Sequence, residues 1–97
     1  MNYYLAFDIG ASSGRHILSW LEDGRMHTRE VYRFDNGIER KDGELCWNHD
    51  RLFNEIVKGM AICKDIGMIP ASVGIYTWGV DFVLLDKEQR QIGNVVG

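Results

Sequence analysis

What the sequence lacks excludes several classes of protein. No apolar run approaches the roughly 20 residues that a membrane-spanning helix needs. The first residues, Met1–Tyr4, carry no positive charge, and no cleavage site typical of a signal peptide comes after them. Lys and Arg number 11 against 14 Asp and Glu, for a net charge of −3, and they form no cluster that would suit a nucleic-acid backbone. The lack of basic clusters does not exclude phosphate-bearing substrates, because backbone N–H groups bind phosphate without net positive charge.

Cysteines and histidines are few and scattered. Cys46 and Cys63 have the spacing of neither a metal site nor a disulfide framework. We expect reduced thiols in a cytoplasmic protein, although the spacing alone leaves a disulfide between them open. His16, His27 and His49 lie in different predicted elements, with no Ser or Cys arrangement for nucleophilic catalysis, so we expect surface or structural roles for them.

The composition that is present is that of an ordinary globular protein. The 97 residues are 45% hydrophobic and 26% charged, which allows one small domain with a modest core. The chain ends on Val95-Val96-Gly97 with no polar cap or closing helix. We therefore expect it to be a piece of a longer protein.

Hydrophobic periodicity predicts several strands and one helix. Strands are predicted at residues 3–7, 15–21, 26–34, 72–77, 81–85 and 91–96, with turns at 22–25 and 86–90 and a loop at 35–45. A helix begins after its N-cap Asn48 and ends near Gly67. Its predicted core stripe is Leu52, Phe53, Ile56, Val57, Met60 and Cys63. This order of elements predicts an α/β unit in which the helix is the crossover to a parallel strand.

The most informative segment is a turn of small residues between two predicted strands. The first strand delivers Asp8 to the turn Ile9-Gly10-Ala11-Ser12-Ser13-Gly14, and the second begins with Arg15. Small side chains let backbone N–H groups approach a phosphate, and glycines supply the dihedrals that such a turn needs. Ser12 and Ser13 add hydroxyl donors. Arg15 can pair with phosphate oxygens, and Asp8 can hold Mg²⁺ directly or through water.

This turn matches neither the Walker A pattern nor the dinucleotide-binding fingerprint, because both require a helix after the turn and this turn leads into a predicted strand. On spacing alone, a plain hairpin turn with an Asp at its mouth is an equally good interpretation.

A second candidate segment comes after the strand at residues 72–77. Trp78 offers a flat apolar face, Gly79 permits close backbone approach, and Asp81 can accept hydrogen bonds from sugar hydroxyls. Open parallel sheets place ligands at such strand ends. Taken alone, the segment is more simply interpreted as Trp78 filling the core and Asp81 capping a turn.

Four segments of the chain resemble the FGGY family of carbohydrate kinases. Residues Tyr4–Arg15 resemble the first phosphate motif of that family, and Gly-Ala-Ser-Ser-Gly-Arg within them is similar to the version in members that act on L-rhamnulose. The other three segments come in the right order: Tyr32–Gly37, Leu45–Asn48 and Gly74–Asp86. Because the four segments are spread in order over residues 4–86, the chain is identified as a member of this family.

The resemblance implies a fold and a reaction. The fold is the α/β actin-like, ribonuclease-H-like ATPase domain, a mixed sheet with a crossover helix. Residues 1–97 would be the N-terminal portion of the first kinase domain, with the second domain absent from this chain. The reaction would transfer phosphate from ATP, with Mg²⁺, to L-rhamnulose and yield L-rhamnulose 1-phosphate. The partners are thus ATP, a small sugar and the rest of the chain, with no nucleic acid or membrane.

The resemblance also implies roles for single residues. Those meeting the ATP phosphates would be Gly10, Ala11, Ser12, Ser13, Gly14 and Arg15. Asp8 would sit near the metal, and Gly79 would lie against the sugar with Trp78 and Asp81 beside it. The family's catalytic base is an Asp further along, beyond Gly97, so we expect no kinase activity from this chain alone.

Two alternatives stay open on the sequence alone. One is another ketose or polyol kinase of the same family, acting on fuculose, xylulose or glycerol. The other is a non-catalytic nucleotide-binding module with the same fold, although the intact Asp8, Gly10 and Arg15 argue against a decayed site. A truncated domain would expose sheet edges and apolar faces, so we expect the fragment to pair with another copy.

Overall fold

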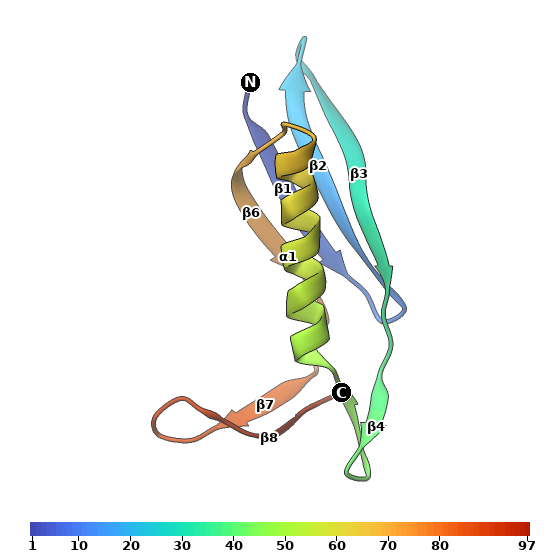
Figure 1. Cartoon of the computed structure of the whole chain (residues 1–97), viewed down its shortest axis with the longest axis vertical. Coiled ribbons are helices and arrows are strands. Elements are labelled where there is room, and N and C mark those ends of the chain that lie inside the picture. Colours follow the sequence, from blue (N-terminus) through green and yellow to red (C-terminus); the bar gives the residue numbers. More distant parts are fainter.

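The computed structural model describes all residues, 1–97, as two four-stranded sheets and one helix (Figure 1). The elements are β1 Tyr3–Ile9, β2 Ser13–Glu22, β3 Arg25–Asp35, β4 Glu39–Lys41, β5 Glu44–Trp47, α1 His49–Asp65, β6 Pro70–Tyr76, β7 Phe82–Leu85 and β8 Gln91–Val96. The strand orders are β3-β2-β1-β6 and β4-β5-β8-β7. The second sheet lies beyond the end toward which β1 and β6 run (Figure 1).

The first sheet is mixed, as the sequence predicts. β1 and β2 are antiparallel, and so are β2 and β3. The hairpin between β2 and β3 turns at Asp23 and Gly24, whose φ values of 54° and 74° are those that a two-residue hairpin turn requires. β6 pairs parallel with β1, and α1 lies on one face of the sheet as the crossover between them (Figure 1). The predicted α/β unit is therefore confirmed.

The ends of α1 are where the sequence predicts them. The Asn48 side chain accepts a hydrogen bond from the backbone N–H of Arg51 at 3.1 Å, which satisfies one of the free donors of the first turn. Asp50 adds an acidic group in that turn, where the helix dipole favours it. The chain leaves the helix through Gly67 at a φ of 75°.

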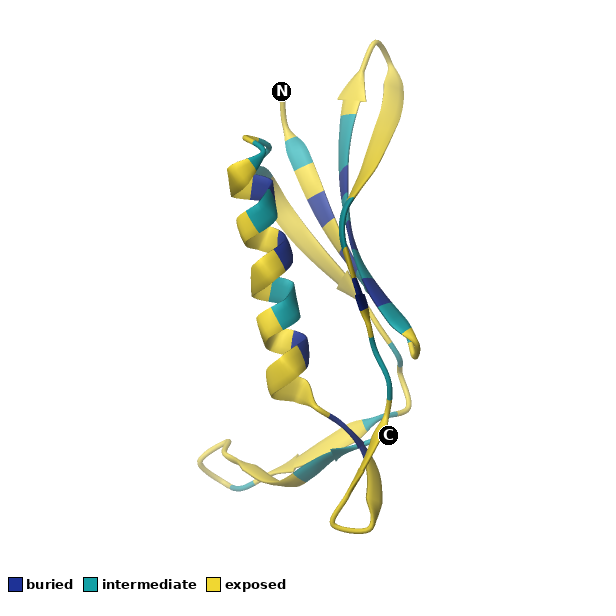
Figure 2. Ribbon diagram, turned by 45° about the vertical axis from the view of Figure 1, so that its right-hand side comes forward, coloured by how far each residue is buried: buried dark blue, intermediate teal, exposed yellow.

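The predicted apolar stripe of α1 is only partly core. Leu52 and Cys63 are buried and Ile56 is partly buried against the sheet. The prediction is wrong for three others, which remain exposed: Phe53 (65%), Val57 (47%) and Met60 (43%). One face of α1 meets the sheet while most of its surface is open (Figure 2), because a four-stranded sheet covers one side of a helix and no further layer is present.

The core between α1 and the first sheet contains one histidine. His16 is buried at 1% exposure, and its Nε2 donates to the carbonyl of Ile56 at 3.1 Å. A Cβ added at Gly59 would lie 2.1 Å from the His16 ring, so this glycine permits the close approach of helix and sheet. Burial lowers the pKa of His16, which is held as the neutral imidazole. The predicted structural role of this histidine is confirmed.

The second sheet corrects the predicted loop at residues 35–45. Asp42 and Gly43, at φ values of 53° and 79°, form a hairpin turn between β4 and β5. Every residue of β4 is exposed, so no alternation of buried and exposed side chains marks it as a strand. β5 is held by β8, about 50 residues away, through Cys46 opposite Val96. Long-range pairing of this kind leaves no local pattern in the sequence.

One edge of the first sheet is open. β6 pairs only with β1, and its apolar residues Val73, Ile75 and Tyr76 are exposed. The same residues have the pattern of a buried strand in the sequence.

As for membranes, α1 falls short of the length and apolarity that a spanning helix requires.

Candidate functional site

Three backbone carbonyls of the turn between β1 and β2 accept hydrogen bonds within the chain. The N–H of Gly10 donates to the carbonyl of Ser13 at 2.9 Å. Asn36, the residue after β3, donates its backbone N–H to the carbonyl of Ser12 at 2.9 Å and its side-chain Nδ2 to the carbonyl of Gly10 at 2.8 Å. Three acceptors of the turn are thereby occupied within the chain.

The same turn leaves two backbone donors free. Ala11 and Ser12 lie outside the strands, both are exposed, and their N–H groups donate to no acceptor in the chain. The carbonyl of Ala11 also accepts no hydrogen bond, so the exposed tip offers two free N–H groups and one free carbonyl. Successive free N–H groups of this kind can bind an anion, and the phosphate-binding role of the turn stays a prediction.

Asp8 and Arg15 flank the turn on facing strands. The two residues are opposite each other in the antiparallel register, and their side chains form an ion pair. Both side chains are partly exposed, at 34% for Asp8 and 40% for Arg15, so each can also reach a ligand at the turn. The predicted phosphate and metal residues therefore lie together at one strand end.

Close packing requires a glycine at position 14 of the turn and leaves little room at Gly10. A Cβ on Gly14 would lie 2.2 Å from the ring of Phe34, so the phenyl group packs directly beneath the start of β2. A Cβ on Gly10 would lie 3.2 Å from the carbonyl oxygen of Ser13. Larger residues at either position would move the turn.

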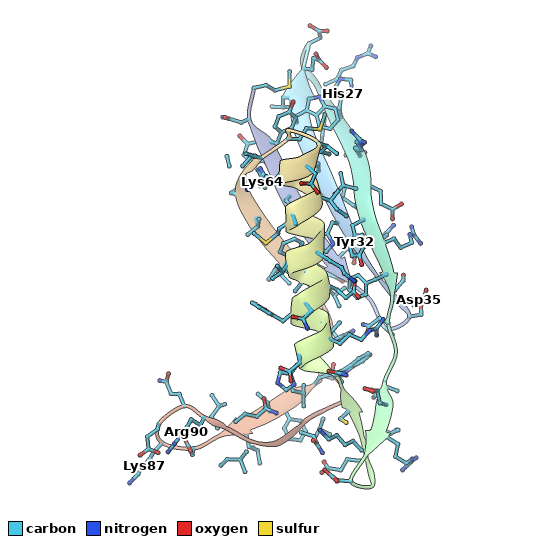
Figure 3. The ribbon with its side chains drawn as sticks, in the orientation of Figure 1. His27, Tyr32, Asp35, Lys64, Lys87 and Arg90 are labelled. Atoms are coloured by element: carbon cyan, nitrogen blue, oxygen red, sulfur yellow. The ribbon has the colours of Figure 1, made fainter.

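Helix α1 is fastened to the end of β3 that supports this turn. Arg51 donates from its guanidinium to the backbone carbonyl of Asp35, and Tyr32 donates its hydroxyl to the carboxylate of Glu55. Figure 3 shows Tyr32 and Asp35 along β3 beside the helix. The hydrogen bond to Glu55 raises the pKa of Tyr32, so this phenol stays a donor at neutral pH.

The second predicted segment leaves the same edge of the sheet. Asp8 is paired with Tyr76 in the parallel register of β1 and β6. Residues 77–81 therefore begin beside the predicted phosphate turn, which is residues 10–14. A groove of about 610 Å³ lies between these strand ends and the first half of α1. Its lining includes Ile9, Thr77, Trp78, Leu52, Phe53 and Ile56.

Trp78 is stacked on a residue for which the sequence predicted no role. Its ring lies parallel to that of Trp47 at the end of β5, with centroids 4.1 Å apart and an interplanar angle of 11°. The indole N–H groups of both rings are buried without an acceptor. The only sequence signal for Trp47 was its place in the segment Leu45–Asn48, which resembles the FGGY family.

Gly79 and Asp81 lie further from the phosphate turn. No atom lies within 4 Å of a Cβ added at Gly79, so the space beside it is open. Asp81 is half-exposed, and Gly97 packs between its carboxylate and the ring of Trp47. No hydrogen bond or ion pair joins Asp81 to the turn at residues 10–14. Through Gly97, Asp81 therefore lies near Trp47, while Gly79 is adjacent to Trp78 only in the sequence.

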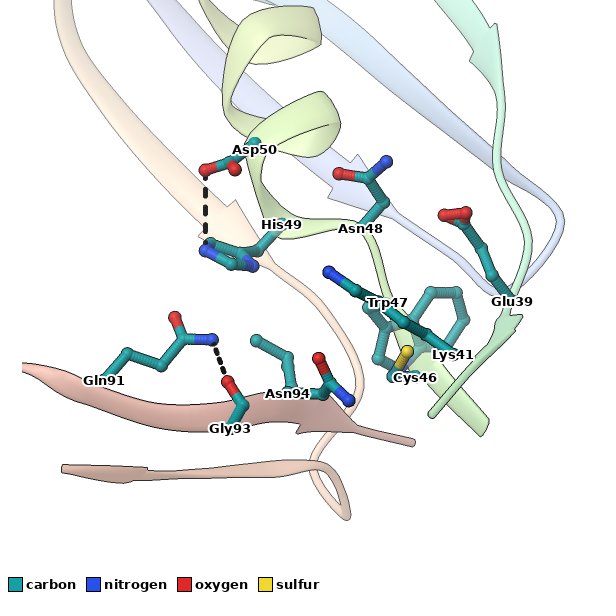
Figure 4. Close-up of a pocket in the computed structure, with 11 residues that line it drawn as sticks. Glu39, Lys41, Cys46, Trp47, Asn48, His49, Asp50, Gln91, Gly93 and Asn94 are labelled. Atoms are coloured by element: carbon teal, nitrogen blue, oxygen red, sulfur yellow. Dashed lines mark hydrogen bonds and ion pairs between the residues drawn. The ribbon is translucent and has the colours of Figure 1, made fainter. Parts of the chain in front are cut away.

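A separate polar cavity of about 310 Å³ lies between the second sheet and the start of α1 (Figure 4). Around it, His49 faces Asp50 at 3.5 Å, and the Gln91 side chain donates to the carbonyl of Gly93 at 2.7 Å. None of the predicted site residues lines this cavity. The cavity nevertheless adjoins the predicted site, because Trp47, which is stacked on Trp78, is part of its lining.

The chain alone does not assemble a complete metal site. No group of three or more His, Cys, Asp or Glu side chains is placed to hold an ion. Asp8 is a single carboxylate beside the turn at residues 10–14. Mg²⁺ commonly binds through one or two carboxylates, water and substrate phosphates, and Asp8 fits that kind of shared site.

Comparison with known proteins gives consistent relatives. The chain is 47% identical over 96 residues to rhamnulokinase of Halalkalibacterium halodurans, covering 99% of this chain and 20% of that protein. It is 47% identical over 92 residues to rhamnulokinase of Ligilactobacillus salivarius (95% and 19%) and 42% identical over 93 residues to that of Bacillus subtilis (96% and 19%). The chain thus spans about a fifth of the length of these relatives. No protein-family model matches it.

Solved structures show the same fold. Xylulose kinase of Lactobacillus acidophilus superposes with a TM-score of 0.72 at 12% identity, covering 99% of this chain and 19% of that one. Gluconate kinase of the same organism gives 0.67 at 13% identity, with 98% and 19% coverage. At such low identity these two establish the fold alone, which is that of the actin-like sugar kinases. Over nearly its whole length the chain is thus similar in sequence to rhamnulokinases and in fold to two further sugar kinases, in agreement with the resemblance to the FGGY family of carbohydrate kinases.

Proposed function

We propose that the protein to which this chain belongs is an ATP-dependent kinase that converts L-rhamnulose to L-rhamnulose 1-phosphate. The observation that carries this proposal is the identity of 41–47% to rhamnulokinases over almost every residue of the chain. The geometry at the end of β1 supports it, because free backbone donors lie there beside a cation and a carboxylate. In this proposal residues 1–97 are the N-terminal portion of the first kinase domain.

The phosphate turn would hold the nucleotide by its backbone. The N–H groups of Ala11 and Ser12 donate to phosphate oxygens, and the hydroxyls of Ser12 and Ser13 add further donors. Arg15 exchanges its ion pair with Asp8 for a phosphate oxygen as the nucleotide binds. Phosphoryl transfer depends mainly on such positioning and charge neutralisation, so a turn of fixed donors supplies a large part of what the reaction needs.

Asp8 would contribute to the metal site. With Arg15 on the phosphates, the Asp8 carboxylate would be free to hold Mg²⁺, directly or through water. The ion supplies charge neutralisation at the transferred phosphate. Magnesium and ATP are thus the proposed cofactor and co-substrate.

The sugar would bind beside the tryptophan pair. Gly79 leaves open space for close approach, Trp78 presents a flat face, and Asp81 accepts hydrogen bonds from hydroxyl groups. We place the catalytic base and the adenosine-binding residues in the part of the relatives that lies beyond residues 1–97. The chain alone is then inactive, because one domain offers only half of a closed cleft.

The exposed apolar surface fits a partial domain. The open edge of β6 and the outer side of α1 would be covered by the remaining four fifths of a protein as long as its relatives. Without that part, two copies would pair through the same surface, and a mass in solution that rises with concentration would show it. We also propose a cytoplasmic location, in keeping with two free thiols.

The proposal is tested by ADP formation. The complete gene product is supplied with Mg·ATP and, separately, L-rhamnulose, L-fuculose, D-xylulose and glycerol. A clear preference in kcat/KM for L-rhamnulose is expected. A preference for another of these sugars would keep the family and reject the substrate, and no turnover on any sugar would reject the kinase proposal.

A further inference from the structure

Asn36 is the residue that holds the turn at residues 10–14 from outside, and its one signal in the sequence is its place in the segment Tyr32–Gly37, which resembles the FGGY family. It comes directly after β3, and the pairing of Ser13 with Asp35 places it opposite Ser12. From there it makes two hydrogen bonds to the turn, 2.9 Å to the Ser12 carbonyl and 2.8 Å to the Gly10 carbonyl. The turn has no other side-chain hydrogen bond from outside it.

These two hydrogen bonds affect which backbone groups of the turn are free to meet a bound anion. A carbonyl oxygen aimed at a bound phosphate would repel it, and a free N–H aimed at it would attract it. By bonding to the carbonyls on either side of Ala11, Asn36 occupies two oxygens that would otherwise be free to face a bound anion. The N–H groups of Ala11 and Ser12 have no acceptor in the chain and are free to donate to a ligand.

The position of Asn36 is itself fixed. Arg51, in the first turn of α1, donates to the carbonyl of Asp35, the neighbouring residue. Phe34, two residues earlier, is buried against Gly14. The backbone on which Asn36 sits is therefore fastened to both the helix and the turn.

We infer that Asn36 is the positioning residue of the phosphate-binding turn, which it orients for nucleotide without touching the nucleotide. This inference rests on the proposed function, because it assumes that the turn binds phosphate groups. Its loss should weaken nucleotide binding and leave the sugar site unchanged.

The test uses the complete gene product and measures the dissociation constant of Mg·ADP by calorimetry, which requires no turnover. Asn36→Ala removes the Nδ2 donor, and loss of one neutral hydrogen bond corresponds to about a 3- to 10-fold weaker affinity. Asn36→Asp keeps the size and removes the donor while adding negative charge, so it should weaken binding at least as much. The KM for L-rhamnulose should stay within about twofold, which a general loss of structure would not allow.

Gln91→Ala is the matched control. The Gln91 amide also donates to a glycine carbonyl, that of Gly93, in the other sheet. This variant should bind Mg·ADP as the wild type does. Thermal unfolding of each variant shows whether it is folded. If Asn36→Ala does not fold, the nearly isosteric Asn36→Asp is used for the test instead.

The outcomes separate the inference from the proposed function. Wild-type affinity for Mg·ADP in a folded Asn36→Ala or Asn36→Asp would overturn the inference and leave the kinase proposal standing. A wild-type protein that binds no Mg·ADP would overturn both. Weakened nucleotide binding with an unchanged KM for the sugar would support both.

Discussion

A single methyl group added at Gly59 should loosen α1 from the sheet. Replacing a helical glycine by alanine usually stabilises a protein by about 1 kcal/mol, because glycine loses more backbone freedom on folding. At Gly59, however, the new Cβ would lie 2.1–2.5 Å from three ring atoms of His16. The ring has little room to retreat, since it packs edge-on against Phe7 at 4.6 Å and Tyr32 at 5.6 Å between centroids.

The magnitude is the sum of three contributions. Overpacking of a filled core costs about 1–3 kcal/mol. Moving α1 away also breaks the hydrogen bond from His16 to the Ile56 carbonyl, at a cost of about 1 kcal/mol. The gain of about 1 kcal/mol from the glycine replacement offsets the second contribution. Gly59→Ala should therefore destabilise the attachment of the helix by about 1–3 kcal/mol.

The assay is amide hydrogen exchange of residues 49–65 in the complete gene product. A loss of about 1–3 kcal/mol accelerates exchange by about 5- to 150-fold when exchange depends on local opening. In a His16→Ala background the clash is gone, so Gly59→Ala should slow the exchange. Equal effects of Gly59→Ala in both backgrounds would refute the packing argument.

Three further predictions concern other buried groups. Burial lowers the pKa of His16 in the folded state, so the unfolded chain takes up this proton first as the pH falls. The free energy of unfolding should therefore be complete above about pH 6.5 and decline below it. His16→Phe should flatten that decline in urea unfolding measured at several pH values. Burial also raises the pKa of the Cys63 thiol, so iodoacetamide should label Cys63 far more slowly in native than in denatured protein, and equal rates would contradict the buried position. Trp47→Ala removes the stacking partner of Trp78, an interaction worth about 0.5–1.5 kcal/mol. In steady-state kinetics it should raise the KM for L-rhamnulose about 2- to 10-fold and leave the KM for ATP unchanged. A rise in both KM values would show a general loss of structure.

Local patterns in the sequence predict the first sheet and the ends of the helix well. The hairpin at Asp23-Gly24, the cap at Asn48 and the stop at Gly67 each depend on residues within a few positions of one another. The phosphate turn is predicted for the same reason, since Asp8 and Arg15 flank one short segment. Short-range chemistry of this kind is visible in a single sequence.

What the sequence could not show depends on distant parts of the chain. The loop prediction at residues 35–45 failed because β5 is completed by β8 from the other end of the chain. Trp47 meets Trp78 across 31 positions, and Asn36 reaches Gly10 across 26. The apolar stripe of α1 was predicted as core, yet Phe53 stays exposed, because periodicity shows which face is apolar and not what covers it.

The proposed kinase function depends most on the turn at residues 10–14 binding the phosphates of a nucleotide. The direct measurement is amide hydrogen exchange at Ala11 and Ser12 in the complete gene product, with and without saturating Mg·ADP. Their N–H groups have no acceptor in the chain, so they should exchange fast alone and slowly with the nucleotide, while the distal hairpin turn at Asp23 stays unchanged. Fast exchange at both residues with Mg·ADP bound would contradict phosphate binding by this turn.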